Sequence, residues 1–293
     1  MLGKSSLMFY LIFAIITSSV IFVIFKMFTT FKIDVFQAIT VNYIVASLLG
    51  YYTSPERITF PGVFSNDWFV YAVISGVGLI ATFYIYGIST QKVGIAITSV
   101  SGKMSVVIPV LVGFIWFKED FNWVRITGIV LAMAAFYFTL LRSESQKAEG
   151  RYLILPVLLF FGNGFNDSVF KVSQELYIKG AYINFLTVAF SVSLLVGLIV
   201  LIPRTIITKQ KILLRNILAG VVLGLFNWFS TYFFLVGLSH FDVSVFIPVF
   251  NVSIVAIAAI IGYMFYREKL STINIIGIAL AIVSIILIAG TGF

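Results

Sequence analysis

Apolar runs of about 18 residues or more recur along the whole chain, separated by short polar breaks, and this pattern predicts membrane-spanning α-helices. A β-barrel would show short alternating strands instead. Almost no residues remain for a soluble domain, so the fold predicted is an all-α integral membrane protein with ten transmembrane helices. The predicted spans are residues 5–28, 35–52, 68–89, 93–117, 123–141, 152–172, 182–202, 212–238, 243–266 and 272–289.

The composition supports a membrane protein and excludes several kinds of functional site. Hydrophobic residues make up 61% of the chain and charged residues 10%, and mean hydropathy is +1.11, whereas about a quarter of the residues of a soluble domain are charged. The chain has no cysteine and one histidine, His240, which excludes disulfides, cysteine nucleophiles and a histidine metal cluster within one chain. No phosphate-cradling loop is present. We therefore expect no metal and no cofactor. The first span is too long for a secretory signal and lacks a small-residue cleavage site, so it is predicted to remain as a helix.

An internal repeat divides the chain. Residues 87–133 resemble residues 237–282, and the repeat predicts a first five-helix unit at 1–142, a linker at 143–151 and a second unit at 152–293. Because five is odd, the second unit must enter the membrane in the opposite sense, which makes an inverted repeat of the kind that recurs in secondary transporters. Channels can also duplicate. The matched positions include Gly87 with Gly237, Val93 with Val243, Glu119 with Glu268, and Gly128 with Gly277.

The segments FKEDFNWVRITGIVLA and YREKLSTINIIGIALA each place a glutamate just before the last helix of a unit and a glycine a few residues into that helix. With the five-plus-five spans, they resemble the EamA-type domains of the drug/metabolite transporter superfamily. The resemblance implies an exporter or exchanger of small organic metabolites, with a central cavity lined mainly by the first four helices of each half. The fifth and tenth helices would then be peripheral, with Glu119 and Glu268 in tight turns.

Lys103 is the most informative charged residue, because it lies deep inside the fourth span. A charge at a helix centre costs about 2.5–3.5 kcal/mol on insertion scales, so such residues usually face a cavity or a partner. Ten residues separate it from Val93, about 15 Å at 1.5 Å per residue, and a lysine stem reaches only about 6 Å. Snorkelling or a purely structural pairing remains the alternative. Gly102 makes the neighbouring surface small, and Pro109 predicts a kink near the Ser105 carbonyl.

A second polar cluster lies in the sixth span, in FGNGFNDSVFK. Asn163, Asp167 and Lys171 are spaced by four and share one helical face, with Asn166 beside it. The hypothesis is a substrate-binding or ion-binding face. The alternative is that Asp167 and Lys171 neutralise each other near the helix end. Two glycines next to the stripe, Gly162 and Gly164, are predicted to allow bending.

Further candidates for substrate binding are polar or aromatic residues in the middle of the eighth and ninth spans, where bonding between helices is the alternative. They are Asn227, Trp228 and Asn251. Tyr84, Tyr86 and Tyr232 could line the cavity, although packing between helices is the favoured interpretation, and Lys26 is interpreted as an interfacial residue. Gly220 and Gly224 predict close helix packing.

The deep charges predict the class of substrate. Lys103 and Lys171 outnumber Asp167, which favours an anionic or zwitterionic metabolite such as an amino acid over a hydrophobic cation. Asp167 would bind an amine or carry a coupling proton. We expect the partners to be a small molecule, the lipid bilayer and a coupling proton or counter-substrate, with no nucleic acid. The rival classes are a channel, which would need a filter or a ring of charges, and a polytopic membrane enzyme, which would need a catalytic constellation. The sequence shows neither.

The distribution of basic residues predicts how the chain is oriented in the membrane. The predicted location is the cell membrane, that is the cytoplasmic or inner membrane, which the chain crosses several times. The side that holds both termini carries six basic residues, and the opposite side carries twelve. The positive-inside rule therefore places both termini outside the cytoplasm, whereas the family resemblance implies that they lie inside. The twelve are Lys26, Lys32, Lys92, Arg142, Lys147, Arg151, Arg204, Lys209, Lys211, Arg215, Arg267 and Lys269.

Overall fold

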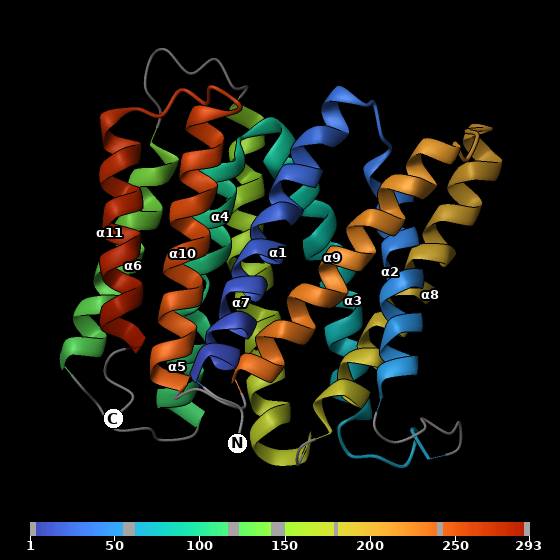
Figure 1. The fold of residues 1–293 in the computed structure, drawn as a ribbon, viewed down its shortest axis with the longest axis horizontal. Coiled ribbons are helices and arrows are strands. Elements are labelled where there is room, and N and C mark those ends of the chain that lie inside the picture. The colour runs from blue at the N-terminus through green and yellow to red at the C-terminus, as the bar shows by residue number, and fades with distance from the viewer. Residues whose placement is uncertain are drawn as a thin grey trace.

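The chain folds into a bundle of long helices (Figure 1). The computed structural model describes residues 4–54, 62–116, 123–141, 150–178, 181–238 and 243–289. In these segments the helices are α1 Lys4–Thr30, α2 Val35–Thr53, α3 Phe69–Lys92, α4 Ile95–Met104, α5 Val107–Trp116, α6 Trp123–Leu140, η1 Gly150–Leu153, α7 Ile154–Ser173, η2 Gln174–Ile178, α8 Tyr182–Thr208, α9 Leu214–Leu238, α10 Val243–Met264 and α11 Thr272–Ala289.

Each predicted span coincides with helix in the structure. Within the described residues, seven helical stretches are long and apolar enough to cross a membrane, and α6, α10 and α11 contribute three shorter apolar helices. An all-helical membrane protein is therefore confirmed. The fourth span is the one that departs from a single helix, because it is divided into α4 and α5.

The helices are arranged so that α6 and α11 lie together at one edge of the bundle (Figure 1). This is the peripheral position that the family resemblance implied for the fifth and tenth spans. Helices α1 and α2 pack on α9, while α7 and α8 pack on α3; α4 packs on α10. Helix α1 begins and α11 ends at the lower side of the bundle in Figure 1.

Close backbone approach between helices depends on small residues, as the sequence predicted for Gly220 and Gly224. A Cβ at Gly220 would lie 2.5 Å from the Ala38 carbonyl oxygen, and one at Gly224 would lie 2.8 Å from the Asn42 carbonyl oxygen. No side chain fits at those distances, so the two glycines let α9 cross directly over α2.

At the upper end of the bundle, Asp34 joins three helices. Its carboxylate accepts the backbone N–H of Gln37 and so caps the N-terminus of α2. The same carboxylate forms an ion pair with Arg204 at the end of α8, with a distance of 2.7 Å, and accepts a hydrogen bond from Gln210. Asn216 in α9 donates to Gln37 at 2.6 Å. These contacts fix the ends of α2, α8 and α9 relative to one another.

Candidate functional site

Lys103 lies where the fourth span breaks in the middle of its length. Helix α4 ends at Met104 and α5 starts at Val107. Pro109 has no N–H to donate to the Ser105 carbonyl, and the N–H of Ile108 donates to that carbonyl instead, at 2.9 Å. The predicted disturbance at the Ser105 carbonyl is confirmed: α4 and α5 are separated by a short turn in which Val106 and Ile108 donate to the carbonyls three residues earlier.

Asp167 lies on the inner face of α7. The residues that α7 exposes at its outer surface form one stripe: Ile154, Leu158, Phe161 and Phe165. At about 100° per residue, Asp167 is turned roughly 200° away from Phe165, toward the side on which α7 packs against α3, α4 and α5. Its side chain is nevertheless exposed. Open space therefore lies beside the carboxylate on the inner face of the helix.

Lys103 and Asp167 interact electrostatically across this space. Lys103 lies at the end of α4 and Asp167 on the inner face of α7. One charge therefore comes from each half of the chain. No direct salt bridge joins them within the described part of the chain. The ammonium of Lys103 instead lies 4.9 Å from the ring centroid of Phe250 in α10, at the distance of a cation–π contact. Two opposite charges are thus held near each other without direct contact.

Tyr86 connects the helices that carry the two charges. Its hydroxyl accepts a hydrogen bond from the Asn163 side-chain amide in α7, at 2.7 Å, and lies against Gly102 in α4 so closely that a Cβ at Gly102 would overlap it. Phe22 of α1 packs edge-on against the Tyr86 ring. Gly102 therefore has a direct role: its missing side chain makes room for the tyrosine hydroxyl next to Lys103.

Asn166 lies in α7 beside the polar face formed by Asn163, Asp167 and Lys171, and its side chain is buried. Its amide nitrogen donates to the Thr82 hydroxyl at 3.4 Å, while its side-chain oxygen has no hydrogen-bond partner in the structure. Helix α7 runs without interruption past Gly162 and Gly164, which pack against the side chains of Thr82 and Ile108. In this conformation the two glycines permit close packing, and bending at them stays a prediction.

The other predicted site residues are distributed differently. Trp228 is buried in the packed interior of α2, α8 and α9, next to Phe190, and is not brought to the Lys103–Asp167 region. Asn227 and Asn251 are partly buried, and Asn251 directly follows Phe250, whose ring faces Lys103. Lys171 lies in the last turn of α7. The functional roles of these residues remain predictions.

A second polar cluster lies at the upper end of the bundle, where Lys26 of α1 meets Glu268 between α10 and α11. The two form an ion pair of 3.0 Å, and their side chains are only 20% and 11% exposed. Lys26 also donates to the Thr90 carbonyl oxygen at the end of α3, at 3.3 Å. We call these three residues the upper lock.

Glu268 binds the start of α4 as well. Its carboxylate accepts the backbone N–H groups of Ile95 at 2.7 Å and Ala96 at 3.3 Å. The N-terminus of a helix favours negative charge, so the carboxylate stabilises α4 in this position. Gly94, with a φ of 123°, brings the chain close enough that a Cβ there would lie 2.9 Å from the carboxylate. Thus one side chain ties the α10–α11 turn to α1 and α4.

Tyr266 completes the surroundings of the upper lock. The Lys26 ammonium lies 5.8 Å from the centroid of its ring. Partial burial raises the pKa of the Tyr266 phenol, and the nearby Glu268 carboxylate raises it further. The phenol thus stays neutral and adds no negative charge to the cluster.

Sequence reasoning did not predict that Lys26, Tyr86 and Phe250 contact site residues. Lys26 was read as an interfacial residue, and Glu268 was expected only in a tight turn, where the structure indeed places it. The available signal for Glu268 was its repetition as Glu119, which lies outside the described residues. Among the residues that the structure describes, no group of three or more His, Asp or Glu side chains is placed to hold a metal ion.

The fold and these clusters define a class: a multi-pass helical membrane protein with charged side chains held in its interior. Comparison with known proteins narrows it. The sequence pattern of the EamA-like transporter family matches residues 167–290, and we assign this part of the chain to that family, within the drug/metabolite transporter superfamily. The resemblance noted from the sequence is confirmed, and the class is that of a membrane transporter.

Two further similarities cover nearly the whole chain. A protein of Haemophilus influenzae (strain ATCC 51907 / DSM 11121 / KW20 / Rd), which carries the description "Uncharacterized protein", is 26% identical over 286 residues, spanning 94% of this chain and 95% of the relative. A solved crystal structure superposes with a TM-score of 0.62 at 15% identity and covers 97% of this chain and 96% of its own. At that identity the second similarity concerns the fold alone.

Proposed function

We propose that this protein is a secondary active transporter, an exporter or exchanger, of small zwitterionic or anionic metabolites such as amino acids. The observation that carries the proposal is the arrangement of Lys103 and Asp167. The Asp167 side chain is exposed and the Lys103 side chain is partly buried; the two opposite charges, one from each half of the chain, interact electrostatically but form no direct salt bridge. Ionisable residues within a membrane span usually mark a substrate or ion pathway.

The substrate class follows from what the two charges require. A substrate carboxylate or phosphate would pair with the Lys103 ammonium, and an amine on the same molecule would pair with Asp167. A zwitterion satisfies both groups at once. A cation would satisfy Asp167 but be repelled by Lys103. The interrupted helix beside Lys103 supports this reading, because discontinuous helices commonly form the binding sites of transporters.

Alternating access between two inverted halves is the mechanism we propose. Its support is the pairing of helices: α1 and α2 pack on α9, and their counterparts in the repeat, α7 and α8, pack on α3. Helices α4 and α10, which correspond in the repeat, pack on each other. In this scheme the upper lock closes one end of the path in the conformation seen here.

A ligand screen followed by a transport assay tests the proposed function. Purified protein is screened by thermal unfolding against anionic, zwitterionic and cationic metabolites; a ligand at about 100 times its Kd stabilises the folded state by about 2.7 kcal/mol. We expect zwitterions or anions to stabilise it. The best ligand is then assayed in proteoliposomes for saturable uptake and for counterflow of labelled substrate. Flux without saturation or counterflow would indicate a channel, and chemical conversion of the ligand a membrane enzyme; either result overturns the proposal.

Replacement of Asp167 by asparagine tests its role in coupling. If the carboxyl carries a coupling proton, Asp167→Asn should abolish accumulation driven by a pH gradient, while exchange of substrate on the two sides of the membrane continues. Loss of both activities would assign Asp167 to substrate binding instead. Unchanged accumulation would remove it from the mechanism. Thermal unfolding of the variant without ligand serves as the control for folding.

A further inference from the structure

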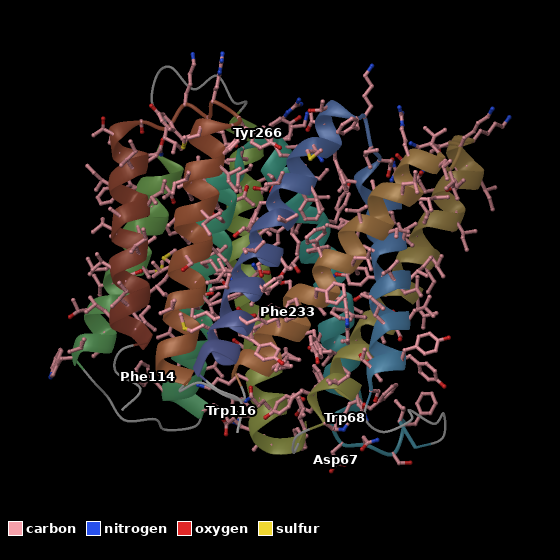
Figure 2. All side chains as sticks on the ribbon, in the orientation of Figure 1. Asp67, Trp68, Phe114, Trp116, Phe233 and Tyr266 are labelled. Carbon is pink, nitrogen blue, oxygen red and sulfur yellow. The ribbon has the colours of Figure 1, made fainter. Side chains whose placement is uncertain are left out.

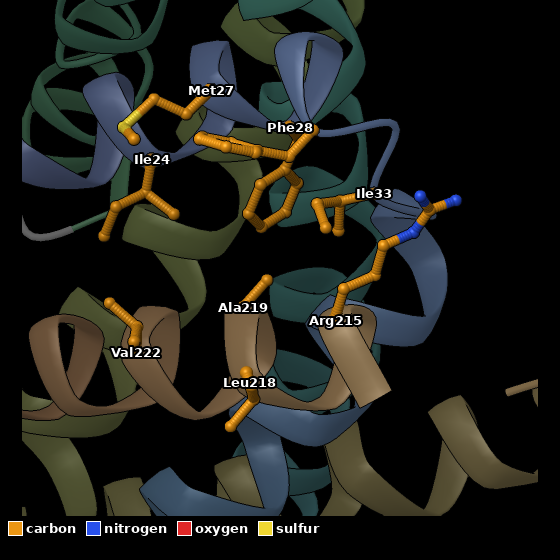
Figure 3. A pocket seen from close by; sticks show the side chains of 9 residues that line it. Ile24, Met27, Phe28, Ile33, Arg215, Leu218, Ala219 and Val222 are labelled. Atoms are coloured by element: carbon orange, nitrogen blue, oxygen red, sulfur yellow. The ribbon is translucent and has the colours of Figure 1, made fainter. Parts of the chain in front are cut away.

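An apolar groove opens on the outside of the bundle between α1 and α9, and it shares no residue with the Lys103–Asp167 region or the upper lock. Its volume is about 480 Å³. Figure 3 shows Ile24, Met27 and Phe28 of α1 on one side of the groove, facing Ala219, Leu218 and Val222 of α9. Several of these side chains, Met27, Leu218 and Val222 among them, are exposed.

The groove is apolar along its body and cationic at one end. Arg215 and Ile33 lie together at that end, and the Arg215 guanidinium extends outward (Figure 3). Arg215 is exposed and makes no hydrogen bond or ion pair with any residue in the described segments. The nearby acid, Asp34, is already paired with Arg204. The positive charge at the mouth of the groove is thus not neutralised by any residue that the structure describes.

The groove lies at the basic end of the molecule. Nitrogen-tipped side chains gather along the upper edge of the bundle in Figure 2, where α1 ends and α9 begins. The described members of the set of twelve basic residues lie on this side, which the positive-inside rule places toward the cytoplasm. The cytoplasmic leaflet carries anionic lipids, and basic pockets between transmembrane helices on that side bind their headgroups.

We propose that the α1–α9 groove binds an anionic phospholipid of that leaflet, with an acyl chain between the two helices and the phosphate on Arg215. The apolar body of the groove matches the chain, because a fitted apolar surface offers the acyl chain more dispersion contacts than disordered lipid does. The unpaired guanidinium matches the headgroup, since it forms two parallel hydrogen bonds with a phosphate.

Native mass spectrometry of the purified full-length chain tests the proposal. Delipidated protein is titrated with phosphatidylglycerol or phosphatidylcholine carrying identical acyl chains. We expect tighter retention of phosphatidylglycerol, and Arg215→Gln should reduce that retention about fivefold, equivalent to about 1 kcal/mol per basic residue. Ala219→Leu, which places extra carbon atoms in the groove, should reduce retention of both lipids. Lys92→Gln removes an exposed charge at the same end, outside the groove, and should change neither.

Three outcomes would overturn the proposal. The first is equal retention of the two lipids by the unsubstituted protein. The second is an equal loss in Arg215→Gln and Lys92→Gln, which would show general attraction to a positive surface. The third is a dimer that Ala219→Leu dissociates, which would assign the groove to a second copy of this chain. Thermal unfolding of Ala219→Leu confirms that the variant folds, and Arg215→Gln, at an exposed position, tests the headgroup contact independently of packing.

Discussion

Lys103→Gln is expected to weaken binding of the zwitterionic or anionic substrate, and so to reduce ligand-induced stabilisation and transport at concentrations near the Kd of the unsubstituted protein. Glutamine preserves much of the side chain's length and polarity but removes the charge. A hydrogen bond to a charged group contributes about 1.5–3 kcal/mol, so the apparent Kd should rise about 10- to 150-fold. Thermal-shift titration measures the Kd, and uptake into proteoliposomes measures transport.

The matched control for this prediction is Lys211→Gln. Lys211 is exposed at the upper end of the bundle, so its replacement removes one positive charge without touching the interior and should leave both readouts unchanged. Equal affinity in Lys103→Gln and the unsubstituted protein would contradict the assignment, and Lys103 would then be a structural partner of Asp167. A lower unfolding temperature of Lys103→Gln in the absence of ligand would likewise indicate a structural role for Lys103.

The helices were predictable because a helix that crosses the hydrocarbon core of a membrane requires a long run of apolar residues. The break in the fourth span could also be predicted from the sequence, because Pro109 has no N–H and the carbonyl four residues earlier therefore loses its hydrogen-bond donor. The stripe of Asn163, Asp167 and Lys171 followed from helical spacing alone. These features depend on residues close together in the chain.

Contacts between distant segments were not predictable in the same way. The ion pair between Lys26 and Glu268 joins residues 242 positions apart, and each residue alone resembles an ordinary interfacial charge. Tyr86 looks like one of many packing aromatics until the fold places its hydroxyl between Gly102 and Asn163. Trp228 was predicted as a site residue but lies in the packed interior. An aromatic residue in the middle of a span can face either a cavity or neighbouring helices, and helical periodicity alone does not distinguish the two.

The two polar clusters have complementary places in the proposed mechanism. Lys103 lies in the last turn of α4, and Glu268 holds the beginning of the same helix through the Ile95 and Ala96 amides. In the proposed mechanism, a movement of the α10–α11 turn away from both α1 and α4 would separate Glu268 from Lys26 and from the start of the helix that carries Lys103. Helix α4 would then connect closure of the upper end with the interior site in the proposed mechanism.

Glu268→Gln should open the upper end of the transport path. The substitution removes the ion pair with Lys26 but keeps a side-chain oxygen that can still accept the Ile95 N–H. Breaking a fully buried ion pair costs about 3–5 kcal/mol; at 20% and 11% exposure, solvent screening lowers this to about 1–3 kcal/mol. The population of the closed conformation relative to an open one should then fall about 5- to 150-fold.

Because the chain contains no cysteine, a single introduced thiol reports this change without background. Thr90 is fully buried, and its carbonyl oxygen belongs to the upper lock. In a Thr90→Cys background, Glu268→Gln should speed labelling by a membrane-impermeant thiol reagent at least fivefold, and Lys26→Gln should do the same. The double substitution should add little, because both changes break one interaction. Ser75→Cys, a buried position in the lower part of α3, is the control reporter. Equal acceleration at Ser75→Cys would mean general loosening, and an unchanged rate at Thr90→Cys would mean that the ion pair does not hold the upper end closed.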